Sequence, residues 1–258
     1  MEQVNIAYST NFKVFDRTKP LLVCFHGNSS SRLTFLYLLG LLADLIQVVA
    51  PDLPGCGDSG HLDSYSMSIL GQIMSNWITS TFNPVSLSVF GHSLGGHLIA
   101  FLNLKFDTVI LAGTPPLSSS NDFPLAFYQN AETAALIPLL SKADPFTDEE
   151  ARLFVSHTGV TGEILEKMIT QAVKTDGKFR IGCLSTITEV NQVAQIECMK
   201  KVVIFHALED GVIREDYLES LNKDCLFEGQ IHYVPGKHMS PILQTDKIVS
   251  VIKRAFCL

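Results

Sequence analysis

Continuous apolar runs alternate with amphipathic stretches along the first half of the chain. Apolar runs of strand length lie at residues 21–27, 46–53, 85–90 and 108–116. Residues 66–82 instead carry apolar side chains at helical spacing, among them Ile69, Ile73 and Trp77. A run that is apolar throughout is typical of a parallel strand covered on both faces. The alternation therefore predicts an α/β fold, with a mostly parallel central sheet flanked by helices.

The alternation stops after residue 116. Residues 117–199 show no strand pattern but several helix patterns, one of which begins with the capping-box sequence Thr147 to Glu150. Another ends at Asp176-Gly177, which we interpret as a helix stop. Strand patterns return at residues 201–208 and 230–234, and an amphipathic helix closes the chain.

An all-helical insertion between two strands is typical of a lid over the carboxyl edge of the sheet, where open α/β sheets bind ligands. We therefore predict a core formed by residues 1–116 and 200–258, with an inserted helical cap formed by residues 117–199. We expect apolar cap side chains to line a pocket for an acyl chain, namely Phe123, Phe127, Leu136, Ile137, Leu140 and Phe154.

Composition narrows the class of protein. The 258 residues are 47% hydrophobic and 17% charged, which excludes a disordered or fibrous chain. The net charge of −7, without a Lys/Arg cluster, argues against nucleic acid as a partner. The first residues lack a secretory signal pattern, and the longest apolar stretch, residues 33–46, is too short to span a bilayer. The scattered cysteines form no C-x-x-C pair. We expect a cytoplasmic protein with no membrane span, of open oligomeric state with a monomer slightly favoured.

The sequence Gly91-His92-Ser93-Leu94-Gly95 lies between a strand pattern and a helix pattern. This is G-x-S-x-G in the strand–turn–helix context of a nucleophile elbow. The glycines allow a turn so tight that the serine is held in a strained conformation with its hydroxyl exposed. We predict Ser93 as a catalytic nucleophile.

A serine nucleophile needs a base that a carboxylate orients, and on this fold the chain order is nucleophile, acid, histidine. Asp210 lies in the turn after the strand that follows the cap, and we predict it as the acid. Glu209 is the alternative, whereas Asp216 fits a solvated helix position better. His238 follows the last strand, in a loop that Gly236 allows to bend, and we predict it as the base.

The other histidines fit the role of base less well. His26 resembles a structural loop residue, and His92 and His97 flank the nucleophile. His206 and His232 lie within strand patterns, and His61 and His157 fall in contexts typical of a surface loop or of the cap.

An oxyanion hole needs two preorganised donors. We predict the backbone N–H of Leu94, directly after the nucleophile, and that of Asn28, in the loop after the first buried parallel strand. The side-chain amide of Asn28 could add a polar contact to the substrate. The chain has no H-E-x-x-H or H-x-H-x-D-H pattern, no G-x-G-x-x-G and no Walker loop, so we predict no metal and no cofactor.

Together these motifs resemble the α/β-hydrolase superfamily over nearly the whole chain. Within it, five segments are most similar to an α/β-hydrolase-fold N-acyl-homoserine lactonase: HGNSSS (26–31), APDLPGCGDS (50–59), GHSLGGH (91–97), AGTPP (112–116) and KTDGKFR (174–180). The resemblance implies Ser93, Asp210 and His238 as the triad, with Asn28 and Leu94 as the oxyanion hole. Such lactonases can carry glutamate as the acid, so Asp210 is a departure that keeps Glu209 open.

These observations predict a metal-independent serine hydrolase that cleaves a small acyl ester or lactone through an acyl-enzyme, an N-acyl-homoserine lactone being one candidate substrate. A thioesterase, a cofactor-free perhydrolase or a carbon–carbon bond hydrolase could use the same triad. A hydrolase-fold receptor with slow turnover is a further alternative. The divergent cap leaves the acyl length open.

Overall fold

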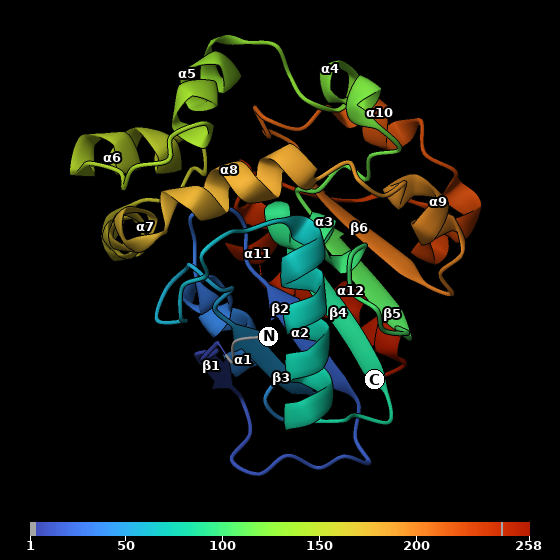
Figure 1. The fold of residues 1–258 in the computed structure, drawn as a ribbon. Helices are drawn as coiled ribbons and strands as arrows, with labels where there is room; N and C mark the ends of the chain where they lie inside the picture. Colours follow the sequence, from blue (N-terminus) through green and yellow to red (C-terminus); the bar gives the residue numbers. More distant parts are fainter. Residues whose placement is uncertain (1–3, 244) are drawn as a thin grey trace.

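A seven-stranded sheet with helices on both faces forms the core of the molecule (Figure 1). The computed structural model describes residues 4–243 and 245–258. The strands are β1 (Tyr8–Thr10), β2 (Leu21–Phe25), β3 (Gln47–Pro51), β4 (Leu87–His92), β5 (Thr108–Ala112), β6 (Val202–Ala207) and β7 (His232–Val234). They are arranged in the order β1-β3-β2-β4-β5-β6-β7. β1 is antiparallel to its neighbour and all other pairs are parallel, which confirms the predicted fold class.

The two faces of the sheet are covered by different helices. The core helices are α1 (Leu36–Leu41), α2 (Met67–Thr81), α3 (Leu94–Ile99), α10 (Glu215–Glu219), α11 (Ser240–Leu243) and α12 (Thr245–Phe256). Along β2, Leu21, Val23 and Phe25 pack into the cluster that contains α2 and α3, whereas Leu22 and Cys24 pack into the cluster that contains α1 and α12. This alternation explains why the strand is apolar at every position. Figure 1 shows α2 in front of the sheet and α12 behind it.

The buried face of α2 only partly coincides with the one that the sequence suggested, since Ile73 and Trp77 are partly buried against the core. Ile69 is 37% exposed, whereas Met74 and Ile78 are fully buried. The cause is close packing at Gly71, where an added Cβ would lie 2.2 Å from the carbonyl oxygen of Phe101. This contact turns the small and apolar residues at positions 67, 70, 71, 74 and 78 inward.

Between β5 and β6 the described chain contains only helices and turns, apart from an isolated bridge at Phe127. The helices are α4 (Phe123–Ala126), α5 (Ala131–Leu140), α6 (Asp148–Ser156), α7 (Gly162–Lys174), α8 (Gly177–Thr186) and α9 (Gln192–Glu197). The predicted capping box is present, with Thr147 accepting from the N–H of Glu150 and Glu150 from that of Thr147. In Figure 1, α5 to α8 lie beyond the carboxyl ends of the strands. We keep the division into a core and a cap at residues 117–199 as a proposal.

Asp176-Gly177 both ends one helix and begins the next. α7 ends at Lys174, but the Asp176 side chain accepts a hydrogen bond from the N–H of Lys178 and so caps α8. An added Cβ at Gly177 would lie 1.8 Å from the carbonyl oxygen of Ala143, so a side chain cannot fit there. The interpretation as a simple stop was therefore incomplete.

A buried arginine holds the cap helices together. The Arg180 side chain is fully buried, and its guanidinium lies 3.8 Å from the centre of the Phe146 ring. Three carbonyl oxygens accept its N–H groups, those of Lys142 at 3.3 Å, Thr175 at 3.3 Å and Asp144 at 2.6 Å. Because a buried cation needs such partners, α8 and the α5–α6 loop hold a fixed relative position.

The strand order reverses between β2 and β4, since β3 lies on one side of this pair and β5 on the other. Ligands of open α/β sheets bind outside the carboxyl ends of the strands at such a switch point. Asn28 follows β2 and Ser93 follows β4, so both occur at this point. Within the described ranges, no helix is long and apolar enough to cross a membrane.

Candidate active site

Ser93 occupies a strained turn between β4 and α3, with φ 50° and ψ −122°. Few residues other than glycine adopt such a backbone conformation. The flanking glycines make the turn possible. A Cβ on Gly91 would lie 2.3 Å from Gly96 Cα, and one on Gly95 would lie 2.2 Å from the carbonyl oxygen of Phe25. The predicted nucleophile elbow is therefore present in its geometry.

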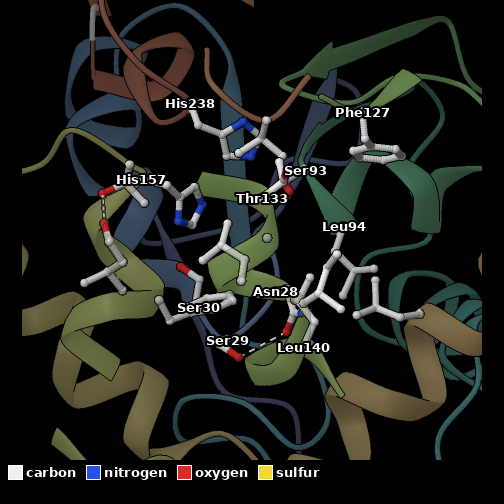
Figure 2. Close-up of a pocket in the computed structure, with 18 of the residues that line it drawn as sticks. Asn28, Ser29, Ser30, Ser93, Leu94, Phe127, Thr133, Leu140, His157 and His238 are labelled. Carbon is white, nitrogen blue, oxygen red and sulfur yellow. Dashed lines mark hydrogen bonds between the residues drawn. The ribbon is translucent and has the colours of Figure 1, made fainter. Parts of the chain in front are cut away.

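Two hydrogen bonds to the backbone of Ser93 fix the elbow to the end of β5 and the residues after it. The N–H of Ser93 donates to the carbonyl oxygen of Ala112 at 2.9 Å, and the Thr114 hydroxyl donates to the carbonyl oxygen of Ser93 at 2.9 Å. Gly113, between Ala112 and Thr114, lies against the His238 ring. A Cβ at this position would lie 3.0 Å from His238 Cε1, so the absence of a side chain lets His238 approach the elbow. Figure 2 shows the Ser93 and His238 side chains at the same end of the pocket.

Asp210 and His238 form a buried pair. His238 Nδ1 lies 2.8 Å from Asp210 Oδ2, and the other carboxylate oxygen accepts the N–H groups of Val212 at 2.9 Å and Ile213 at 3.1 Å. Burial raises the pKa of Asp210, but the charge of His238 and these hydrogen bonds outweigh it and lower that pKa to about 2. The ionised carboxylate can only accept, so Nδ1 carries the proton and Nε2 is left free to act as a base.

The two alternative acids lie elsewhere. The Glu209 side chain is exposed, and the Asp216 carboxylate pairs with Arg214 on the surface. Of the three carboxylates considered from the sequence, the structure brings Asp210 alone to His238.

His92, directly before Ser93, contacts the backbone of His238. Burial and the charge of His238 lower the pKa of His92 to about 3, so its ring is neutral. Its Nε2 lies 3.1 Å from the carbonyl oxygen of His238, to which it donates. The sequence placed His92 beside the nucleophile but gave no sign of this contact.

The predicted oxyanion residues Asn28 and Leu94 both line the pocket that contains Ser93. Asn28 comes from the loop after β2 and Leu94 is the first residue of α3. Ser29 donates to Asn28 Oδ1 at 3.1 Å, whereas Asn28 Nδ2 is buried without a hydrogen-bond partner among the described residues. The assignment of their backbone N–H groups to an oxyanion hole stays a prediction.

A cavity of about 410 Å³ extends from Ser93 between the sheet edge and the cap. All six apolar cap residues expected from the sequence line it, together with Val155, Met168, Leu184 and Ile187. Among the described residues that line it there is no Lys, Arg, Asp or Glu. An uncharged cavity of this size fits a small ligand with an apolar chain. In residues 4–243 and 245–258, no His, Cys, Asp and Glu side chains are grouped as metal ligands would be.

His157 is a pocket residue that the sequence analysis missed. We expected a surface-loop or cap context; His157 does lie in the cap segment, next to α6, but its side chain is buried and lines the cavity near His238. A signal was available, because His157 follows Phe154 by three residues and helical spacing places both on the buried face of α6.

The turn that carries Asp210 is joined to the first segment of the cap. Phe127 and Ile213 form an antiparallel bridge. The flanking hydrogen bonds run from Tyr128 N–H to Val212 O at 2.9 Å, from Arg214 N–H to Ala126 O at 2.9 Å and from Asn130 Nδ2 to Gly211 O at 3.0 Å. Phe127 and Tyr128 also line the pocket, so one wall of the pocket and the candidate acid share a single backbone unit.

We expect kcat/KM to decrease at low pH and to reach half of its maximum at a pH above 6.5, which is the ordinary pKa of histidine. Burial lowers the pKa of His238, but the charge and hydrogen bond of Asp210 outweigh it, so that this pKa is raised. A base must be neutral, and activity is therefore lost as pH falls through this raised value. The measurement is kcat/KM on an uncharged ester across pH, and a half-maximal point below pH 6.5 would contradict the assignment.

Comparison with known proteins shows the family and the fold of the chain. The model of the alpha/beta hydrolase family matches residues 22–222. A biotin biosynthesis bifunctional protein, BioHC of Cellvibrio japonicus, is 23% identical over 253 residues, which are 92% of this chain and 47% of that protein. A protein phosphatase methylesterase 1 of Candida albicans is 29% identical over 110 residues, 41% of this chain and 31% of that protein. The chain thus spans less than half the length of these relatives.

Solved structures show the same fold. The N-acyl homoserine lactonase AidH, complexed with N-butanoyl homoserine, superposes with a TM-score of 0.83 at 22% identity, covering 98% of this chain and 94% of that one. An esterase from Thermogutta terrifontis superposes with a TM-score of 0.75 at 15% identity, covering 97% and 92%. The family model spans most of the sheet and includes Ser93 and Asp210, and the chain belongs to the alpha/beta hydrolase family.

Proposed function

We propose that this chain is a serine hydrolase that cleaves uncharged acyl esters and lactones, including N-acyl-homoserine lactones. The observation that carries the proposal is the buried Asp210–His238 pair, 2.8 Å between Nδ1 and Oδ2, at the same end of an uncharged apolar cavity as the strained Ser93. Similarity to an N-acyl homoserine lactonase, an esterase and two methylesterases supports the ester class.

The proposed reaction begins with attack of Ser93 Oγ on the carbonyl carbon, while His238 Nε2 takes the hydroxyl proton. Asp210 keeps the imidazole oriented and stabilises the imidazolium that forms. The oxyanion accepts hydrogen bonds from the backbone N–H groups of Asn28 and Leu94. When the tetrahedral intermediate collapses, His238 returns the proton to the leaving oxygen, which in a lactone stays tethered to the acyl group. Water activated by His238 then hydrolyses the acyl-enzyme.

The cavity favours esters and lactones over larger carriers. A coenzyme A thioester brings several phosphates, and the lining residues that the structure describes include no Lys or Arg to bind them. The apolar side chains of α5, α6 and α7 instead suit an alkyl chain. The same uncharged lining disfavours a substrate that carries a free carboxylate.

A substrate panel tests this proposal. We expect kcat/KM for N-hexanoyl-homoserine lactone and 4-nitrophenyl butyrate to exceed that for butyryl-coenzyme A by about tenfold or more, because phosphates lack partners in this pocket. Ring opening is followed by pH-stat and ester cleavage by absorbance. A preference for the thioester would favour a thioesterase. Tight binding of the lactone with negligible turnover would favour a receptor.

A further inference from the structure

Glu132 brings a carboxylate from the cap to the turn that carries Asp210. It lies in the first turn of α5, and its side chain is half-buried. A Cβ on Gly211, the residue directly after Asp210, would lie 2.1 Å from Glu132 Oε2. The carboxylate of Glu132 therefore occupies the space that a side chain at position 211 would need, and it lies against the backbone of the acid turn.

The N-cap of α5 fixes this contact. Asn130 Nδ2 donates to the carbonyl oxygen of Gly211 at 3.0 Å, and Asn130 Oδ1 accepts the N–H of Thr133 at 2.9 Å. One side chain thus joins the first turn of α5 to the acid turn. Figure 2 shows Thr133, the residue after Glu132, among the side chains around the pocket that also contains His238. The start of α5 is therefore held at the candidate catalytic pair.

The charge of Glu132 is not neutralised by a close cation. Three other glutamates of the cap form ion pairs: Glu150 with Lys142 at 2.6 Å, Glu163 with Lys167 at 2.8 Å and Glu166 with Arg152 at 2.8 Å. Arg214, three residues after Gly211, pairs with Asp216. No ion pair within residues 4–243 and 245–258 includes Glu132. A half-buried charge without a counterion acts on its surroundings more strongly than a paired one.

The group that this charge can act on is His238. Burial lowers the pKa of His238, the charge and hydrogen bond of Asp210 raise it, and the charge of Glu132 raises it further. Burial also lowers the pKa of three other histidines around the pair, which are therefore neutral at pH 7: His92, His157 and His206. Lys237 precedes His238 in the chain, and its side chain is exposed. Asp210 and Glu132 are thus the two negative charges that favour a protonated His238.

We propose that Glu132 is a positioning residue of the cap that holds a negative charge beside the Asp210–His238 pair and stabilises the imidazolium formed during the reaction. This role rests on the proposed function, since it concerns the proton that passes from Ser93 Oγ to His238 Nε2. Both carboxylates stay ionised in this step, and only Asp210 accepts a hydrogen bond from the ring. Because Glu132 belongs to α5, the cap contributes to the basicity of His238 as well as to the wall of the pocket.

Glu132→Gln tests this role, because glutamine keeps the shape that packs on Gly211 and removes only the charge. We expect the pH at which kcat/KM on 4-nitrophenyl butyrate is half-maximal to decrease by about 0.3 to 1 unit, as for one charge acting at an effective dielectric constant between those of protein and water. The maximal kcat should fall about two- to tenfold, because the imidazolium loses part of its stabilisation. Glu132→Asp, which keeps the charge, should stay closer to the wild-type pH profile.

Glu149→Gln is the matched control, because Glu149 is an exposed glutamate in the first turn of α6 and its replacement makes the same change in net charge. It should leave the rate and the pH profile at their wild-type values. If Glu132→Gln lowers the rate without moving the pH profile, or if Glu149→Gln moves it equally, the inference is wrong.

A titration of the His238 ring by NMR separates this inference from the proposed function. The ring signal is identified by its loss in His238→Gln, and we expect its pKa to be lower in Glu132→Gln than in the wild type. The same pKa in both proteins would overturn the inference whatever the activity. A lower pKa in the variant, combined with a wild type that cleaves neither esters nor lactones, would support the action of Glu132 on His238 and refute the proposed function.

Discussion

Replacing Ser93 by alanine is expected to lower kcat on both esters and lactones by about 10⁴- to 10⁶-fold, since removal of a triad nucleophile leaves only the oxyanion donors and binding. The elbow should survive the change, because alanine keeps the Cβ and the backbone bonds to Ala112 and Thr114 do not involve the hydroxyl. The measurement is initial rate on 4-nitrophenyl butyrate, together with the thermal unfolding midpoint.

A glycine at position 93 tests the backbone strain of the elbow separately from the chemistry. Glycine adopts a φ of 50° without the strain that a Cβ imposes. We expect Ser93→Gly to be as inactive as Ser93→Ala but more stable, by about 1 kcal/mol in the free energy of unfolding. Ser88→Ala is the matched control, because Ser88 is buried in β4, the strand that ends just before Ser93, and lies outside the pocket lining. Full esterase activity in Ser93→Ala would show that another group is the nucleophile.

Replacing Asp210 by asparagine is expected to lower kcat by about 10³- to 10⁴-fold. The carboxylate now accepts the Nδ1 proton of His238, whereas an amide nitrogen at that position would favour the opposite tautomer and occupy the base with a proton. The loss of charge also lowers the pKa of His238, which Asp210 raises in the wild type. The acid limb of kcat/KM should therefore move to lower pH in the variant.

The control for this substitution is Glu209→Gln, which removes a neighbouring carboxylate whose side chain is exposed. It should keep both the rate and the pH profile of the wild type. The opposite result, with Glu209→Gln inactive and Asp210→Asn active, would assign the acid to the residue that the sequence held as the alternative.

Much of the core could be predicted because strands buried on both faces have few acceptable residue types. β2, β3, β5 and β6 all fall inside the continuous apolar runs. The candidate triad followed from topology, since a motif after one strand fixes which later turns can approach it. The sequence left a choice of acid between the neighbouring residues Asp210 and Glu209. The structure distinguishes them, because Asp210 is buried and Glu209 is exposed.

Helix faces and the cap were less predictable. The inward face of α2 depends on how closely Gly71 can approach Phe101, which is a tertiary contact that no local pattern reports. The burial of His157 depends on packing between α6 and the loop that carries His238. In a helical insertion no strand pattern shows which way each helix faces. A polar residue that faces a cavity therefore cannot be told from a surface residue by sequence alone.

The backbone unit that joins residues 126–130 to residues 211–214 limits how this protein can acquire new substrates through recombination. A crossover at the start of the cap would place a foreign segment against the acid turn and risk the alignment of Asp210. A crossover after residue 130 would exchange α5 to α8 and leave that alignment intact. The module that can be inherited independently of the catalytic machinery is thus smaller than the whole cap.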